Sequence, residues 1–215
     1  MHVKFSWKFS NIFEKLWKSW KFQIFWKYSN IFKNFFYIQN PIIKAVNNHP
    51  SLESLLIITG AHLLKEYGYT VEEVRGEGHN VIAEIDSLKV SDDPSSRIKG
   101  AAIQLQELIK VFEKEKPDII ISPYDREESI TTALAGVYMN VPVAHLGAGD
   151  RTRVNVDGII RHSVTKLSHI MFCSTKENAQ RIIKMGEEKF RVHIVGHTAF
   201  ERYKGVASLS KKKVG

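Results

Sequence analysis

"DIIISPYDREESITTALAGVYMNVPVAHL", residues 118–146, decides the fold class of this 215-residue chain. Two short runs that are almost entirely apolar, 118–122 and 141–146, flank a segment with helical spacing at about 128–139. A strand with apolar residues on both of its faces belongs inside a parallel sheet that helices cover on both sides. The stretch therefore predicts one strand-helix-strand unit of an α/β protein.

The same alternation continues on both sides of this unit. Amphipathic spacing marks the helices, and short apolar runs mark the strands. Because the two kinds of element alternate, the sequence predicts an α/β fold with a doubly wound parallel sheet. The further helices are expected at about 41–48, 95–115, 157–167 and 176–185, and the further strands at 55–58, 81–85, 169–174 and 191–196.

Composition divides the chain into three segments. We expect the folded domain at 41–198, preceded by an aromatic, basic extension at 1–40 and followed by a basic tail or linker at 199–215. The net charge of +8 comprises +6 in the extension and +4 in the tail, which leaves −2 for the domain. A domain without a basic excess does not predict a nucleic-acid partner.

The chain has one cysteine, Cys173. A single cysteine excludes an internal disulfide and a cysteine-based zinc site. This usage fits the reducing cytoplasm, where we expect the protein to act.

The extension repeats itself, since "WKFSNIFEKLW" at 7–17 returns as "WKYSNIFKNFF" at 26–36. Apolar residues from Phe9 to Ile24 follow helical spacing with lysines on another side, which predicts an amphipathic helix. No apolar run approaches the roughly 18–20 residues that span a bilayer. Three interpretations stay open: a poorly structured or oligomerising extension, a helix in a membrane interface, or low-complexity sequence never selected as protein.

Ligands of doubly wound sheets bind beyond the carboxyl ends of the strands. Three loops leave those ends, at 59–63, 122–129 and 147–158, and the last two hold most of the acidic groups without an obvious partner. Gly147 and Gly149 would let the backbone come close to a ligand. We therefore expect the functional site at these loops.

The ordered motifs of these loops resemble the hydrolysing UDP-N-acetylglucosamine 2-epimerases. The similarity covers about 41–198, and the block 141–169 is its specific part. The motifs are "YDR" at 124–126 for a Gly-Asp-Arg turn, "PVAH" at 142–145, "GAGD" at 147–150 for a Gly-Gly-acid loop, an acid that opens a helix at 157, and "IRHSVTKLSH" at 160–169.

The resemblance implies the Rossmann-like half of a two-domain enzyme of the GT-B type, with the active site between the domains. It implies that a UDP-sugar is the substrate and that UDP-N-acetylglucosamine and water become N-acetylmannosamine and UDP. The implied steps are removal of the sugar C2 proton, anti loss of UDP to a glycal, and addition of water. This chemistry requires no metal and no cofactor.

The resemblance also assigns residues, position by position. It implies Asp125, Asp150 and Asp157 as the acid/base set, with no face of the sugar assigned to any of them. Moving a proton off and onto carbon needs carboxyl groups with tuned pKa values. Arg161 lies one helical turn after Asp157 and is expected to hold that carboxylate. The implied substrate-binding residues are His62, His145, Gly147, Gly149, Arg161 and His162.

Structural interpretations compete with these roles. Asp157 suits the N-cap of a helix, and Asp125 suits an exposed cap. Asp150 stands where family members often carry the longer Glu. Arg161 would form an ordinary solvated helix pair if it had no part in the site.

The sequence departs from the family in two places, one before the domain and one within it. Family members open with a strand and a Gly-Thr-Arg-type loop, and we find no counterpart in 1–40. Tyr124 stands in place of the turn glycine, so we expect a backbone with less freedom to take a positive φ.

In the family the second domain would begin near Gly215. We therefore expect a second-half polypeptide or another copy of the chain as a partner, and no turnover by this polypeptide alone. Two other functions stay open. One is a non-catalytic UDP-sugar-binding or remnant module, held at a membrane surface through 1–40. The other is half of a GT-B glycosyltransferase, which the three acids and "IRHSVTKLSH" disfavour.

Overall fold

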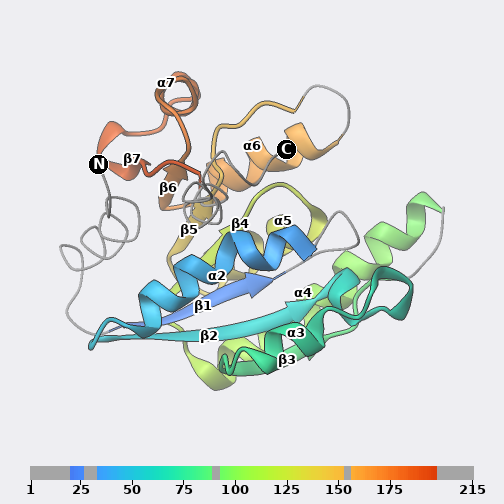
Figure 1. The fold of residues 1–215 in the computed structure, drawn as a ribbon. Helices are drawn as coiled ribbons and strands as arrows, with labels where there is room; N and C mark the ends of the chain where they lie inside the picture. Colours follow the sequence, from blue (N-terminus) through green and yellow to red (C-terminus); the bar gives the residue numbers. More distant parts are fainter. Residues whose placement is uncertain (1–19, 27–32, 89–92, 153–155, 198–215) are drawn as a thin grey trace, which may run out of the picture.

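The computed structural model describes residues 20–26, 33–88, 93–152 and 156–197, and these form seven strands in one sheet with helices against it (Figure 1). The strands are β1 (Trp20–Trp26), β2 (Leu52–Thr59), β3 (Val81–Ile85), β4 (Ile119–Pro123), β5 (Val143–Leu146), β6 (Ile170–Cys173) and β7 (Val192–Ile194). The helices are α2 (Lys33–Asn47), α3 (Val71–Gly76), α4 (Pro94–Glu115), α5 (Glu127–Tyr138), α6 (Asp157–Leu167) and α7 (Lys176–Lys184), with 3₁₀ turns at η2 (Gly60–Leu63), η3 (Lys65–Tyr67) and η4 (Lys189–Arg191).

The sheet has the strand order β3-β2-β1-β4-β5-β6-β7, and every neighbouring pair is parallel. The chain runs outward from β1 to β3, returns to place β4 beside β1, and then runs outward to β7. The direction reverses between β1 and β4, and doubly wound sheets bind their ligands beyond the carboxyl ends of the strands at such a point. The predicted doubly wound parallel sheet is confirmed.

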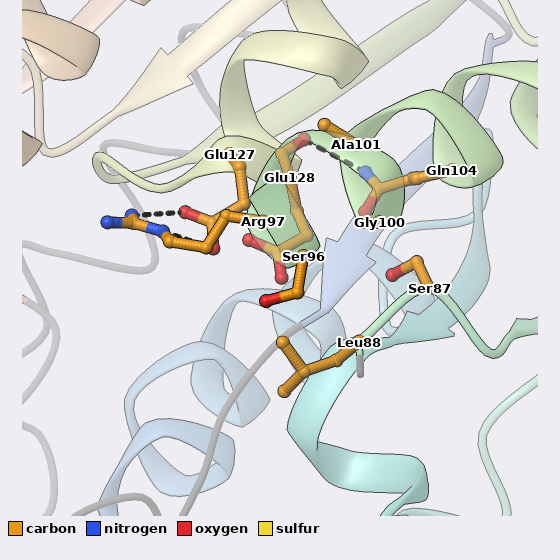
Figure 2. A pocket seen from close by; sticks show the side chains of 9 residues that line it. All are labelled: Ser87, Leu88, Ser96, Arg97, Gly100, Ala101, Gln104, Glu127 and Glu128. Atoms are coloured by element: carbon orange, nitrogen blue, oxygen red, sulfur yellow. Dashed lines mark hydrogen bonds and ion pairs between the residues drawn. The ribbon is translucent and has the colours of Figure 1, made fainter. Parts of the chain in front are cut away.

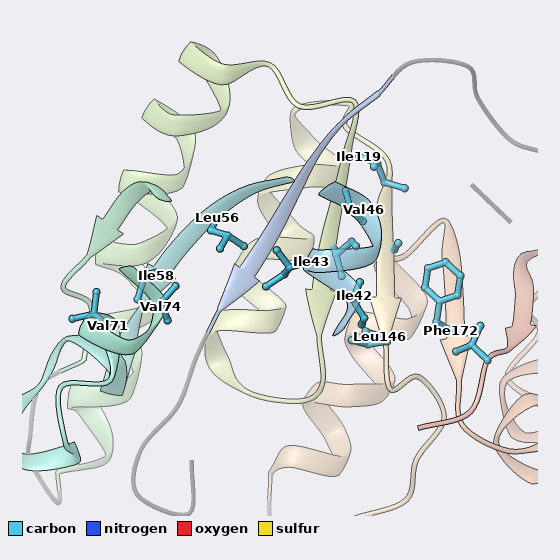
Figure 3. Packing of buried hydrophobic residues seen from close by; sticks show 13 residues of the cluster. Ile42, Ile43, Val46, Leu56, Ile58, Val71, Val74, Ile119, Leu146 and Phe172 are labelled. Atoms are coloured by element: carbon cyan, nitrogen blue, oxygen red, sulfur yellow. The ribbon is translucent and has the colours of Figure 1, made fainter. Parts of the chain in front are cut away.

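Apolar side chains pack on both faces of the sheet. In β4, Ile119 and Ile121 belong to the cluster that α2 and α3 cover (Figure 3), whereas Ile120 packs with residues of α4 and α5. All three are at most 1% exposed. Alternate residues of one strand therefore meet two helical layers, which explains why 118–122 is so apolar.

Helices α6 and α7 extend the layer of α4 and α5. Val143 of β5 is the register partner of Ile120, and it packs against Val164 of α6. Met171 of β6 packs against Ile182 of α7. Four helices thus cover one face of the sheet, and their amino ends follow the carboxyl ends of the strands.

The elements predicted after residue 41 are all present, with bounds that differ by a few residues. The helix at 157–167 has the predicted bounds, and the helix expected at 41–48 is the last part of α2. The short helix α3 and the strand β1 were not predicted. Residues 199–215, expected as a tail, lie outside the described part of the chain.

The amphipathic helix predicted from Phe9 to Ile24 is wrong where the structure describes it. Residues 20–26 form β1, which pairs with β2 and β4. Since β1 lies inside the sheet and α2 crosses residue 40, the domain boundary predicted there is also wrong. "WKFQI" alternates apolar and polar residues, and this period-2 pattern of a strand outweighs the helical spacing.

Candidate functional site

The three predicted acids come from three segments at the carboxyl edge of the sheet. Asp125 follows β4, Asp150 follows the turn after β5, and Asp157 is the first residue of α6. The N-cap positions of α5 and α6 are Arg126 and Val156, without a side-chain cap bond at either. The capping interpretations of Asp125 and Asp157 are therefore not supported.

Arg161 joins two of these carboxylates. Its side chain is buried, its Nη2 pairs with the Asp125 carboxylate, and its Nη1 lies 3.3 Å from Asp150 Oδ2. The same Nη1 donates to the main-chain oxygen of Gly147 at 2.9 Å. Arg161 thus ties the loops after β4 and β5 to α6. The predicted pairing with Asp157 and the solvated helix pair are both wrong, because the long side chain of Arg161 reaches Asp125 and Asp150 instead.

The surroundings of Asp125 perturb its carboxyl group. Burial raises the pKa of its carboxyl above the ordinary value, the positive charge of Arg161 opposes that rise, and the negative charge of Asp157 adds to it. The last effect means that Asp157 lies close enough to act on Asp125 through space. Arg161 therefore joins Asp125 and Asp150, and Asp157 lies within electrostatic range of Asp125.

The Asp150 carboxylate has further partners on α7. Asn178 Nδ2 donates to Asp150 Oδ1, and Arg181 Nη1 donates to the main-chain oxygen of Gly149. The sequence analysis missed Asn178 and Arg181. A signal for them exists in the sequence, because α7 begins directly after the carboxyl end of β6 and so faces the same edge as the predicted loops.

His145 supports the turn that carries Asp125. Burial lowers the pKa of this fully buried imidazole to about 3, so the ring is neutral at pH 7. Nε2 lies 2.7 Å from the main-chain oxygen of Tyr124, which only accepts, and Nδ1 lies 3.1 Å from the Thr165 hydroxyl. The network thus assigns the proton to Nε2. With both nitrogens bonded inside the protein, the structure contradicts a direct substrate contact by His145.

Tyr124 adopts the positive φ that the sequence analysis did not expect. Its φ is 63°, its N–H donates to the Leu146 oxygen at 2.8 Å, and His145 binds its carbonyl. A left-handed conformation at a bulky residue costs on the order of 1–3 kcal/mol, so these bonds hold the turn in place. The conformation redirects the chain after β4 and brings Asp125 into the interior.

The two predicted loop glycines have structural reasons of their own. A Cβ on Gly147 would lie 2.7 Å from the Tyr124 ring, and one on Gly149 would lie 2.7 Å from the main-chain oxygen of Asn178. Both also have positive φ. Backbone approach to a substrate at these glycines stays a prediction.

The two remaining predicted histidines occupy different places. His162 follows Arg161 on α6, and burial together with the charges of Arg181 and Arg161 lowers its pKa. Its buried Nδ1 has no hydrogen-bond partner in the described part of the chain. His62 lies in η2 after β2, where its Nδ1 pairs with the Thr70 hydroxyl. Since β1 separates β2 from β4, His62 stands about 10 Å along the sheet from the Asp125 turn.

A pocket lies between the amino ends of α4 and α5 (Figure 2), and none of the three predicted acids lines it. At its mouth Arg97 Nη2 pairs with Glu127 at 2.7 Å. This bond raises the pKa of the Arg97 guanidinium, and the charge of Asp157 contributes to the rise. The lining residues are Ser87, Leu88, Ser96, Arg97, Gly100, Ala101, Gln104, Glu127 and Glu128.

The described residues show neither a metal cluster nor a membrane span. No group of three or more His, Cys, Asp or Glu side chains among residues 20–26, 33–88, 93–152 and 156–197 is arranged to hold a metal ion. Within the same residues, no helix has the length and apolar character needed to span a membrane.

Comparisons with known proteins identify the family. The family model described as UDP-N-acetylglucosamine 2-epimerase matches residues 44–214. A UDP-N,N'-diacetylbacillosamine 2-epimerase (hydrolyzing) of Legionella pneumophila is 32% identical over 159 residues, which are 74% of this chain and 42% of the relative. A GDP/UDP-N,N'-diacetylbacillosamine 2-epimerase (hydrolyzing) of Campylobacter jejuni is 32% identical over 176 residues, which are 82% of this chain and 46% of the relative.

The solved structures show the same fold. The UDP-GlcNAc 2-epimerase of Neisseria meningitidis, bound to UDP-GlcNAc, superposes with a TM-score of 0.72 at 18% identity. The superposition covers 90% of this chain and 52% of the Neisseria chain. The chain spans less than half the length of the two curated relatives above. By its sequence and its fold, the chain belongs to the UDP-N-acetylglucosamine 2-epimerase family.

Proposed function

We propose that this chain supplies the carboxylate-bearing half of a hydrolysing UDP-sugar 2-epimerase. The observation that supports it is that Arg161 binds both Asp125 and Asp150, with Asp157 in electrostatic range of Asp125, at the edge where doubly wound sheets bind their ligands. The relatives at 32% identity carry hydrolysing 2-epimerase activity in their names.

The proposed reaction takes a proton from sugar C2 and breaks the C1–O bond to UDP. One carboxylate accepts the C2 proton, the C–H electron pair forms the C1–C2 double bond of a glycal, and UDP leaves with the C1–O pair. A water molecule then adds its oxygen to C1 and gives one proton to a carboxylate, while a carboxyl group delivers a proton to C2 from the opposite face. The products are the free 2-epimeric amino sugar and UDP.

The electrostatics of the site suit proton transfer by carboxyl groups. Burial raises the pKa of Asp125, which brings a carboxyl group closer to the working pH of a general acid or base. Arg161 limits this rise and keeps the side chain in one orientation. The negative charge of Asp157 favours protonation of Asp125, which suits Asp125 to the role of a general acid.

For the substrate we propose UDP-N-acetylglucosamine, with N-acetylmannosamine and UDP as products. The relatives act, by their names, on UDP-linked diacetylbacillosamine, and a neighbour in structure was solved with UDP-GlcNAc. All are UDP-linked 2-acetamido sugars. UDP-N,N'-diacetylbacillosamine is therefore the second substrate to test.

The test is incubation with each UDP-sugar in D₂O, followed by NMR of the sugar and a coupled assay for released UDP. We expect UDP and a 2-epimeric sugar that carries deuterium at C2. Because the relatives are about twice as long, the chain is assayed alone and mixed with a polypeptide that carries the second domain of the Campylobacter jejuni relative.

Substitutions of the three acids test whether they catalyse the reaction. Asp125→Asn, Asp150→Asn and Asp157→Asn should each lower kcat by about 100-fold or more, the usual contribution of a general acid or base. Asp118→Asn, at the other end of β4, is the matched control and should leave kcat unchanged. Absence of UDP release in every arm, with calorimetric binding of the UDP-sugar intact, would support a non-catalytic binding module instead.

A further inference from the structure

Asn178 lies in the first turn of α7 and is largely buried. Thr175 caps this helix, because its Oγ1 accepts from the Asn178 N–H at 3.2 Å. The side-chain amide of Asn178 therefore does not cap the helix, and it points toward the loop that carries Asp150.

Arg181 decides which way the amide points. Its Nη1 lies 3.1 Å from Asn178 Oδ1 and also donates to the main-chain oxygen of Gly149. A guanidinium only donates, so the oxygen of the amide must face Arg181 and the NH₂ group must face Asp150. The donor at Asn178 Nδ2 then meets the acceptor at Asp150 Oδ1.

Asp150 is consequently bound at both oxygens from two different helices. Asn178 of α7 donates to Oδ1, and Arg161 of α6 donates to Oδ2 at 3.3 Å. The loop itself rests on α7, because Gly149 packs directly against the main chain of Asn178. The side chain of Asp150 is still 30% exposed, so the carboxylate is fixed and remains open to solvent on one side.

We propose that Asn178 is a positioning residue that fixes the orientation of the Asp150 carboxylate for the epimerase reaction. This inference rests on the function proposed above, and it adds α7 to a site so far made from β4, β5 and α6. Without the amide, the Asp150 side chain keeps one partner and can rotate about its bonds. A carboxyl group displaced by about 1 Å loses on the order of 100-fold in rate.

The kinetic test compares two variants of Asn178 on UDP-N-acetylglucosamine. Asn178→Ala removes the donor and should lower kcat by about 10-fold, with KM changed less than threefold. Asn178→Asp keeps the size but places a second carboxylate against Asp150, so kcat should fall further, by about 100-fold. A role in packing alone predicts the reverse order, with the smaller Ala more damaging, and that order would overturn the inference.

Thr175→Ala is the matched control, because it removes the cap at the start of α7 without removing the amide. We expect its kcat to stay within twofold of the wild type. If Thr175→Ala and Asn178→Ala lose kcat equally, the effect comes from helix stability and the positioning role fails.

A second measurement does not depend on turnover. The side-chain NH₂ signal of Asn178 is assigned in a ¹⁵N spectrum by its loss in Asn178→Ala, and should shift when Asp150 is replaced in Asp150→Ala. If the Asn178 NH₂ signal shifts but the protein has no epimerase activity, Asn178 does contact Asp150, and it is the proposed function that fails. An NH₂ signal unchanged by Asp150→Ala would overturn the inference whatever the activity.

Discussion

The guanidinium of Arg161 is buried against the carboxylate of Asp125, and both residues are less than 10% exposed. A buried charge that loses its partner destabilises a protein by about 3–5 kcal/mol, because the remaining ion stays out of water without compensation. We expect Arg161→Met and Asp125→Leu each to lower the free energy of unfolding by about this amount.

The double variant Arg161→Met/Asp125→Leu separates the pair from its surroundings. Because it removes both charges, it should lose clearly less than the sum of the single variants in urea unfolding followed by circular dichroism. Additive losses would show that the two side chains do not interact in solution. Arg75→Gln, which breaks a solvent-exposed pair with Glu84, is the comparison and should change stability little.

The arrangement of Asp125 and Asp157 predicts a coupled titration. Burial raises the pKa of Asp125, and the negative charge of Asp157 contributes to that rise. Asp157→Asn should therefore move the midpoint of the Asp125 carboxyl signal to lower pH in a ¹³C NMR titration. The same signal should not move in Asp118→Asn. If Asp157→Asn leaves the midpoint of the Asp125 signal unchanged, Asp157 lies outside the site.

The sheet could be predicted from sequence because most of its strands are short apolar runs between amphipathic helices. Residues 118–122 and 141–146 have apolar residues on both faces, and only a strand between two helical layers requires that pattern. β1 could not be separated in this way, since "WKFQI" fits a period of two while its wider surroundings fit a helix.

The positions of the three acids could also be predicted, because topology places the carboxyl ends of parallel strands at one edge. The acids that Arg161 binds could not be predicted. Its long side chain reaches several acids, and packing around α6 decides that it binds Asp125 and Asp150. Asn178 was missed because it lies 28 residues from Asp150 in the chain, and only the fold brings them together.

His145 predicts how stability depends on pH. Its pKa is about 3 in the folded protein against an ordinary value of 6.5, so the folded state binds fewer protons between these values. Its contribution is therefore complete above pH 6.5 and is lost as the pH falls toward 3, at about 1.4 kcal/mol per pH unit.

The prediction is tested by the difference between the wild type and His145→Gln. Glutamine keeps a donor for the Tyr124 oxygen but does not titrate, so the stability advantage of the wild type should shrink as the pH falls below 6.5. His79, His162, His169 and His193 also have lowered pKa values, but they titrate in both proteins and cancel in the difference. A difference that stays constant from pH 7 to pH 4.5 would contradict the buried neutral imidazole.

Gly149 and Gly186 provide a matched pair of substitutions. Both have positive φ, 77° and 91°, so an alanine carries a similar backbone cost at each. Around Gly186 nothing lies within 4 Å of an added Cβ, whereas at Gly149 the Cβ would lie 2.7 Å from the Asn178 oxygen and 2.8 Å from Ile182. Gly149→Ala should therefore lower the free energy of unfolding by about 1–3 kcal/mol more than Gly186→Ala in urea unfolding, the usual cost of overpacking.

The same clash should be visible by NMR. Because it pushes the Asp150 loop away from α7, Gly149→Ala should also shift the side-chain NH₂ signal of Asn178. Equal losses for the two variants would mean that the loop does not rest on α7, and the second support of Asp150 would then be absent.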